Sequence, residues 1–314
     1  NFLVVTYLVS LFLIFDTWYQ YFMGVDFFGI EMHAQNRLTG PFNGPHVGMW
    51  LTKIIILPLF LFTIINKYKN FLNIKFSTLI IFIFFSIFFF TIFITGERMA
   101  LLMTILSIFT ILFGLILSKN ISILKMVVFL FFISLAIYFF SIIDPEQASR
   151  AITSTINKII NWRNSDYGKI WKSAYDVWLE SPWFGAGLHK YREACELLGT
   201  YGTFEKPKWG GVCFHPHNVS MQLLSETGIV GFILFFTMVI SISIRLLKDS
   251  YIKKDWLLYF LIINVLIACF LPIQSNTDFF SNKYSSLVWL LVGVTLGLCR
   301  YIENIKNSPH FNQS

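Results

Sequence analysis

The chain has 314 residues, of which 56% are hydrophobic and 18% aromatic, and its formal net charge is +7. Its mean hydropathy is +0.66, and apolar runs near the roughly 20 residues that span a bilayer recur along it. This composition excludes a soluble domain and also a β-barrel, which needs alternating rather than continuous apolar residues, and it predicts an all-α, polytopic transmembrane helix bundle.

Eight apolar segments are predicted to form membrane helices. They are residues 1–15, 46–65, 76–95, 99–117, 123–142, 218–244, 256–275 and 284–300. The domain organisation we expect is an N-terminal part of the bundle (1–142), a loop subdomain (143–217), C-terminal transmembrane helices (218–303) and a tail (304–314). Because the first apolar run starts at Asn1 without an initiator Met or a charged flank, we expect earlier helices to precede it.

Positive charges in short loops predict which side of the membrane is cytoplasmic. The basic residues of these loops and of the C-terminal segment are Lys67, Lys69, Lys75, Lys119, Lys125, Arg245, Lys248, Lys253, Lys254, Arg300 and Lys306. With eight helices they all fall on one side, so residues 16–45, the turn at 96–98 and the loop 143–217 are expected outside. The net charge is thus partly topological, and no nucleic-acid partner is predicted.

Three features lie before the third predicted helix. Residues 16–30 mix aromatic and polar side chains, which is typical of a segment at the membrane surface. The Gly and Pro residues between Arg37 and His46 predict a non-helical loop that could line a cavity. Lys53, about two turns inside its helix, either reaches the headgroups or faces an internal polar site, and both readings stay open.

Arg98 belongs to the short hairpin Thr95-Gly96-Glu97-Arg98 between two apolar runs. It is therefore expected at the outer interface. There it either contacts lipid phosphate or holds the diphosphate of a substrate, which suits its planar fork of donors.

The hydrophilic loop 143–217 is expected to form a lid-like outer subdomain. Aromatic and small residues recur there at helical spacing and predict an amphipathic helix that ends near residues 181–187. These residues are Tyr167, Trp171, Ala174, Tyr175 and Trp178. Arg163 and Arg192 flank that helix and either remain solvated or bring positive charge over the bundle.

Two of the four cysteines belong to the same loop. Cys195 and Cys213 are expected in an oxidising compartment, where they can form a disulfide, although two unpaired thiols are the alternative. Cys269 and Cys299 lie in apolar runs and are most simply core residues.

His217 is the candidate base. Pro216 fits the first turn of a helix, which would put His217 at the helix mouth, where the dipole favours anions and a neutral imidazole. The alternative is a histidine that only caps neighbouring groups. Asn218, Gln222, Ser225 and Glu226 fall on one face of this helix.

The remaining polar motifs give weaker signals. His215 and His217 lack a matching set of further ligands, so no metal is predicted, and a Gly-rich nucleotide loop is missing from the sequence. Asp278 follows a break in the apolar pattern at Pro272 and either shapes the same mouth or belongs to a plain loop.

The order of these pieces resembles the O-antigen ligase and polymerase superfamily of bacterial envelope proteins. The resemblance rests on His215-Pro216-His217-Asn218 with the Gln222-to-Gly228 run and Gly231, and it extends from about Thr95 to Leu247. Supporting pieces are the hairpin ending at Arg98, Arg163 before Trp171, Ser181-Pro182-Trp183-Phe184-Gly185-Ala186-Gly187, and Tyr191-Arg192. Glu97 stands where small polar residues are commoner in the family.

The resemblance implies a glycosyltransferase of the bacterial inner membrane that acts on its periplasmic face without a metal or other cofactor. The implied donor is an undecaprenyl-diphosphate-linked glycan, and the acceptor is lipid A-core for a ligase or another glycan for a polymerase. His217 corresponds to the family's histidine, and Arg98 and Arg163 correspond to its diphosphate-binding arginines. We expect Arg192, Asn218, Gln222, Arg37 and Lys53 to support substrate binding.

Two other functions stay open. A transporter or flippase for the same lipid would also need outward arginines, but the sequence has no internal repeat, and the third to fifth apolar runs contain no charge in their cores. A structural membrane scaffold would use the loop subdomain to bind a partner.

Overall fold

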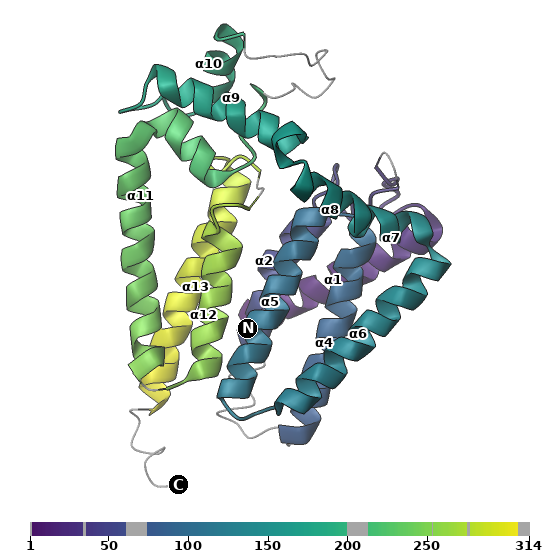
Figure 1. Cartoon of the computed structure of the whole chain (residues 1–314). Helices are drawn as coiled ribbons and strands as arrows, with labels where there is room; N and C mark the ends of the chain where they lie inside the picture. The colour runs from purple at the N-terminus through teal and green to yellow at the C-terminus, as the bar shows by residue number, and fades with distance from the viewer. Residues whose placement is uncertain are drawn as a thin grey trace. The chain divides into compact units, whose positions relative to one another are not determined.

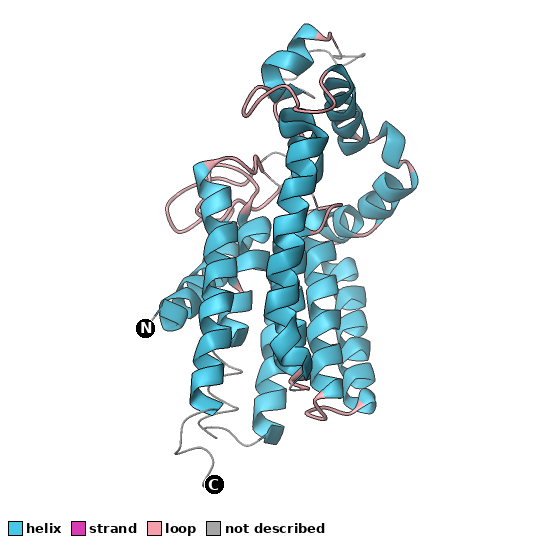
Figure 2. Cartoon of the chain, turned by 90° about the vertical axis from the view of Figure 1, so that its left-hand side faces the viewer, coloured by secondary structure: helices cyan, strands magenta, loops and turns pink. Residues whose placement is uncertain are grey.

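The computed structural model describes residues 2–33, 36–60, 74–199, 213–252, 254–274 and 277–306. Helices joined by loops make up these residues (Figures 1 and 2), and the pairs Val25–Glu31 and His33–Arg37 are isolated β-bridges. Five of the described helices are long and apolar enough to cross a membrane, which confirms the all-α, multi-pass class. Lys67, Lys69, Lys253 and the tail beyond residue 306 lie outside the described residues.

Each of the eight predicted apolar segments contains a helix. These are α1 (Phe2–Met23), α2 (Val47–Ile54), α4 (Ile74–Thr95), α5 (Arg98–Leu117), α6 (Ile123–Ile143), α11 (Val219–Ile252), α12 (Trp256–Phe270) and α13 (Asn282–Lys306). Between α6 and α11 lie α7 (Pro145–Ala151), α8 (Thr153–Ile160), the 3-10 turn η1 (Trp162–Asn164), α9 (Asp166–Glu180) and α10 (Tyr191–Leu197).

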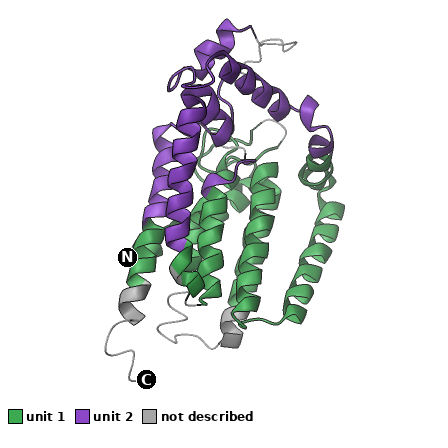
Figure 3. Cartoon of the chain, turned by 60° about the vertical axis from the view of Figure 1, so that its left-hand side comes forward, with its two compact units in different colours: residues 1–156, 247–268, 294–314 green, residues 157–246, 269–293 purple. Residues whose placement is uncertain are grey.

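The chain forms two compact units (Figure 3). Unit 1 comprises residues 1–156, 247–268 and 294–314, and unit 2 comprises residues 157–246 and 269–293. In unit 1, α4 packs against α1, α2, α5 and α7. A buried polar contact joins α5 to α12, because Asn264 Nδ2 donates to Thr110 Oγ1 across 2.9 Å and Ser107 Oγ donates to Asn264 Oδ1.

The C-terminal part of α1 differs from the expectation. Residues 16–23 continue the helix, so the predicted helix end at residue 15 is wrong, whereas their place at the membrane surface stays a prediction. Asp16 and Gln20 are fully buried, and Gln20 Oε1 accepts the backbone N–H of Thr39 across 2.8 Å. The polar side chains of Asp16 and Gln20 therefore bind residues of the following loop, such as Phe27 and Thr39, to the end of α1. The sequence pattern alone does not distinguish this burial from exposure to headgroups.

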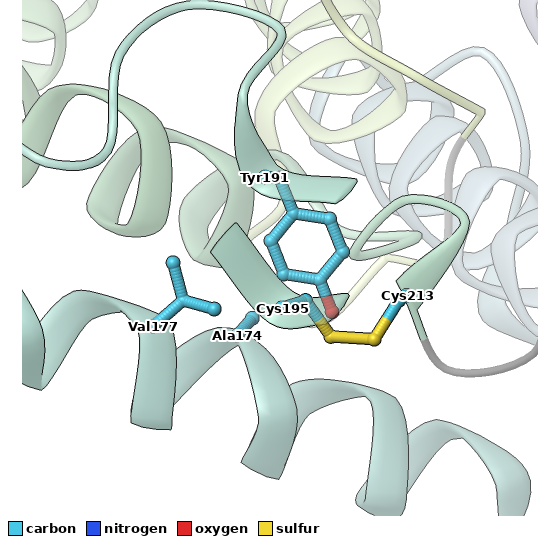
Figure 4. Packing of buried hydrophobic residues seen from close by; sticks show 5 residues of the cluster. All are labelled: Ala174, Val177, Tyr191, Cys195 and Cys213. Carbon is cyan, nitrogen blue, oxygen red and sulfur yellow. A yellow bond between two sulfur atoms is a disulfide. The ribbon is translucent and has the colours of Figure 1, made fainter. Parts of the chain in front are cut away.

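A small core holds the helices of the loop subdomain together within unit 2 (Figure 4). Ala174 and Val177 of α9 pack against Tyr191 and Cys195 of α10, and a disulfide joins Cys195 to Cys213. Met221, in the first turn of α11, packs against this cluster. The core thus fixes both sides of the segment 214–218, which contains His217.

The turn 182–187 packs into a kink of α11. Gly228 adopts φ 65° and ψ −171° and interrupts the helix, which frees backbone groups that the turn then satisfies. The N–H of Ile229 donates to Pro182 O across 2.9 Å, and the N–H of Ala186 donates to Ser225 O across 2.8 Å. A Cβ on Gly228 would lie 2.3 Å from Trp183 O, so the close approach requires glycine.

Candidate functional site

His217 lies two residues before α11 in unit 2. Its φ of 52° is in the left-handed region, which histidine tolerates better than most residues with side chains. Its backbone N–H donates to His215 Nδ1 across 3.1 Å, and the two imidazole centroids are 3.6 Å apart. Both side chains are half-buried. Two protonated rings at this separation would repel each other strongly, which favours a state with at least one neutral imidazole.

α11 starts one residue after the predicted start at residue 218. Pro216 is outside the helix, which starts at Val219, so the assignment of Pro216 to the first turn is wrong. Asn218 Oδ1 accepts the N–H of Met221 across 3.0 Å and therefore occupies the N-cap position, which asparagine fills well. The preference for a cap at Asn218 outweighs the preference of proline for the first helical position.

Asn218 and Gln222 hold the loop before α13 against α11. The Asn218 amide donates to Pro272 O and to Gln274 O. Gln222 Nε2 donates to Asp278 Oδ1, and Gln222 Oε1 accepts the N–H of Phe279 across 2.8 Å. Both residues are 2% exposed. These bonds therefore fix the N-terminal end of α11 and hold Asp278 beside it.

Arg163 is exposed on η1, one turn before α9. Its carbonyl oxygen packs against Gly168, where a Cβ would lie 2.9 Å away. In the same turn of α9, the ring of Tyr167 meets that of His217 edge-on, with centroids 6.1 Å apart. The backbone of Arg163 therefore packs on the same turn of α9 that carries Tyr167, the residue in contact with His217.

Arg192 is exposed on α10 and pairs with Glu196, with 3.2 Å between Nε and Oε1. Such an exposed pair contributes little stability. His189, three residues before Arg192, makes two further contacts. Its backbone N–H donates to Glu226 Oε2 across 3.1 Å, and its side-chain Nδ1 is 3.9 Å from Asp278 Oδ2.

In unit 1, Glu97 is the centre of a charged cluster. Its carboxylate accepts the N–H groups of Gly48 and Met49, across 2.6 and 3.0 Å, at the first turn of α2. Burial raises the pKa of Glu97 to about 7, although these bonds and the charges of Arg37 and Lys53 oppose the rise.

Arg37 and Lys53 both lie close enough to Glu97 for their positive charges to act on its pKa. Lys53 is fully buried, so of the two placements left open it takes the internal one. Arg37 is half-buried in the loop before α2. Burial, and then the positive charge of Arg37, lower the pKa of His46, the residue before α2.

Arg98 is the first residue of α5 and is half-buried. A helix N-terminus favours a negative charge, so an arginine at this position gains from an anion bound beside it. The structure thus brings Arg98 and the Glu97 cluster together in unit 1, while His217, Asn218 and Gln222 belong to unit 2.

The sequence pattern missed three contributors. His215 is the acceptor for the backbone of His217, Tyr167 contacts the His217 ring, and Arg150 of α7 packs on the hairpin that carries Arg98. Of the three, only His215 could have been found in the sequence, through the motif His215-Pro216-His217. The contacts of Tyr167 and Arg150 depend on tertiary packing. In the described part of the chain, His, Cys, Asp and Glu side chains form no group of three or more that could hold a metal.

These arrangements suit transfer of a group from a phosphate leaving group to a hydroxyl. A neutral imidazole can accept a proton, and guanidinium groups can stabilise the charge that develops on departing phosphate oxygens.

The comparison with known families agrees with the chemistry. Residues 81–236 match the family model described as O-antigen ligase. This region includes Arg98, Arg163, the disulfide and His217. No curated protein sequence matches the chain. By residues 81–236, the chain belongs to the O-antigen ligase and polymerase superfamily of membrane glycosyltransferases.

Proposed function

We propose that the protein is an O-antigen ligase. It transfers a glycan from undecaprenyl diphosphate to a hydroxyl of lipid A-core on the periplasmic face of the bacterial inner membrane. The observation that carries this proposal is the half-buried His217 imidazole, held against His215 and Tyr167 within the family region.

In the proposed reaction, His217 removes the proton of the acceptor hydroxyl. The acceptor oxygen attacks the anomeric carbon, the bond between that carbon and the diphosphate oxygen breaks, and undecaprenyl diphosphate leaves with the bonding electron pair. Arg98 and Arg163 stabilise the leaving group, with Arg37, Lys53 and Arg192 adding positive charge. A single displacement inverts the anomeric centre.

Asn218 and Gln222 take part by holding the mouth of α11 rather than by forming new bonds to substrate. Both amides already bind backbone groups or Asp278. In this proposal, replacing either one changes the position of His217 and its access to the acceptor.

The test is a transfer assay in liposomes with purified protein, a lipid-linked glycan and lipid A-core. A ligase attaches the glycan to lipid A-core. Lengthening of the lipid-linked glycan instead would identify a polymerase, and movement of the donor across the bilayer without any new glycosidic bond would identify a transporter. A protein that does none of these three things would have a scaffold role.

A further inference from the structure

Arg150, in the last turn of α7, lies over the hairpin between α4 and α5. A Cβ on Gly96 would be 2.9 Å from Arg150 Cδ and 3.7 Å from its Nη1. Gly96 has φ 68°, so both its backbone conformation and its missing side chain make room for the arginine. The guanidinium of Arg150 is thereby kept close to the hairpin that contains Glu97 and Arg98.

A second arginine is bound to the same place. Gln147 of α7 donates from Nε2 to the carbonyl oxygen of Asn36 across 2.8 Å, which ties the residue before Arg37 to α7. Burial lowers the pKa of Arg150; Glu146 raises it, and the charge of Arg37 lowers it. The two guanidinium groups are therefore near enough to repel each other.

Both arginines have buried donors without acceptors. Arg150 Nη1 and Arg37 Nε are inaccessible to solvent and have no hydrogen-bond partner among the described residues. A buried donor left in this state costs roughly 1–3 kcal/mol, and more when it is charged. Two such donors on mutually repelling cations are a costly arrangement for a protein that binds nothing there.

The carboxylates nearby do not supply the missing acceptors. Glu97 accepts N–H groups at the first turn of α2. Asp144 accepts the Tyr21 hydroxyl across 2.7 Å and the N–H of Gln147 across 3.1 Å. Glu146 is mostly exposed and lies 3.7 Å from the other terminal nitrogen of Arg150.

We propose that Arg37 and Arg150 together bind a phosphate-type anion beside the Arg98 hairpin. A tetrahedral oxyanion presents several acceptors to two guanidinium forks, which is the pairing that arginine geometry favours. The anion is either the diphosphate of the glycan donor or the phosphate of a lipid headgroup. If the anion is the diphosphate of the glycan donor, the inference rests on the proposed function. If it is a headgroup phosphate, the inference is independent of that function.

The test uses the whole protein purified in a maltoside detergent, which contains no phosphate. Thermal unfolding is followed during titration with inorganic diphosphate, and separately with short-chain phosphatidylglycerol, because a ligand that binds only the folded state raises the unfolding temperature. The variants are Arg150→Gln, Arg37→Gln, the double variant and Arg150→Lys. Arg245→Gln is the matched control, because it removes an exposed arginine of α11.

Without anion, Arg150→Gln is expected to unfold at the same or a higher temperature than wild type, because a repelling cation with a buried unsatisfied donor is gone. With anion, Arg150→Gln and Arg37→Gln each weaken binding about tenfold or more, the double variant loses less than the sum, and Arg150→Lys lies in between. Arg245→Gln behaves as wild type.

The proposal is overturned if Arg150→Gln leaves the affinity for both anions unchanged, or if neither anion raises the unfolding temperature of the wild type. An Arg150-dependent effect of diphosphate alone assigns the site to the glycan donor, and an effect of phosphatidylglycerol alone assigns it to a headgroup. Failure of glycan transfer in the liposome assay, with anion binding intact, would remove the proposed function and leave this site in place.

Discussion

The backbone N–H of His217 donates to the Nδ1 atom of His215 across 3.1 Å, with the two rings 3.6 Å apart. This bond requires an unprotonated Nδ1 on His215. It also stabilises the left-handed backbone of His217, which sets the direction of the candidate base. We therefore expect His215 to be a positioning residue.

The test of that role compares two substitutions of His215. Asparagine can offer a carbonyl oxygen near the place of Nδ1, whereas phenylalanine keeps the ring size and removes the acceptor. His215→Phe is expected to lower kcat for glycan transfer about 10- to 100-fold with little change in KM, and His215→Asn to retain most activity. Equal activity of the two variants would contradict a positioning role.

The raised pKa of Glu97 predicts that the free energy of unfolding depends on pH. Its pKa is raised from 4.5 to about 7 in the folded protein, mainly by burial, so the folded state holds a proton that the unfolded state releases. Its contribution is complete below pH 4.5 and is lost as the pH rises through 7, a change on the order of 3 kcal/mol.

The measurement is the free energy of unfolding between pH 5 and 8 for wild type and Glu97→Gln. The variant is expected to lose most of the decline with pH, because its neutral amide does not titrate in this range. Parallel curves for the two proteins would show that Glu97 is not the group responsible.

The apolar periodicity predicted the helices because each long apolar run must satisfy its backbone internally in a membrane. It located the hairpin at Arg98 for the same reason. It ended the first helix too early, at residue 15, since the polar side chains of Asp16 and Gln20 gave no sign that they are buried at the end of α1. A mixture of polar and aromatic residues is expected both for a segment exposed to lipid headgroups and for a helix end buried against a loop.

The candidate site was only partly predictable. His217 and Arg98 belong to recognisable motifs, but the exclusion of Pro216 from the first turn of α11 accompanies a cap at Asn218. The approach of Arg150 to Gly96 depends on tertiary packing between α7 and the hairpin. Contacts between segments some 50 residues apart leave no local signal in a single sequence.

The disulfide is expected to stabilise the segment that carries His217. Cys213 is buried four residues before it, and the bond to Cys195 closes a segment with a sequence separation of 18. The double variant Cys195→Ser/Cys213→Ser should lose about 3 kcal/mol of unfolding free energy and transfer glycan more slowly. Cys299→Ser, which alters a cysteine outside the disulfide, is the control. Unchanged stability of the double variant would refute this expectation.

The contact between the turn 182–187 and the kink of α11 predicts that Gly228 cannot carry a side chain. Gly228→Ala adds a Cβ that clashes with the Trp183 backbone and strains a positive φ, so it should cost more than about 3 kcal/mol. Gly199→Ala is matched for positive φ but has open space around it, and it should cost only the backbone strain. Similar losses in stability for both variants would exclude the close packing as the cause.

In the proposed reaction, the imidazole of His217 takes the proton of the acceptor hydroxyl. The most direct measurement is the initial rate of glycan transfer in liposomes by His217→Asn and by its matched control His189→Asn. Both histidines have positive φ, which asparagine tolerates, so both variants should insert and fold. We predict that His217→Asn lowers the rate at least about 100-fold, as expected for loss of a general base, while His189→Asn stays near wild type. Transfer by folded His217→Asn at a rate close to wild type would contradict the account.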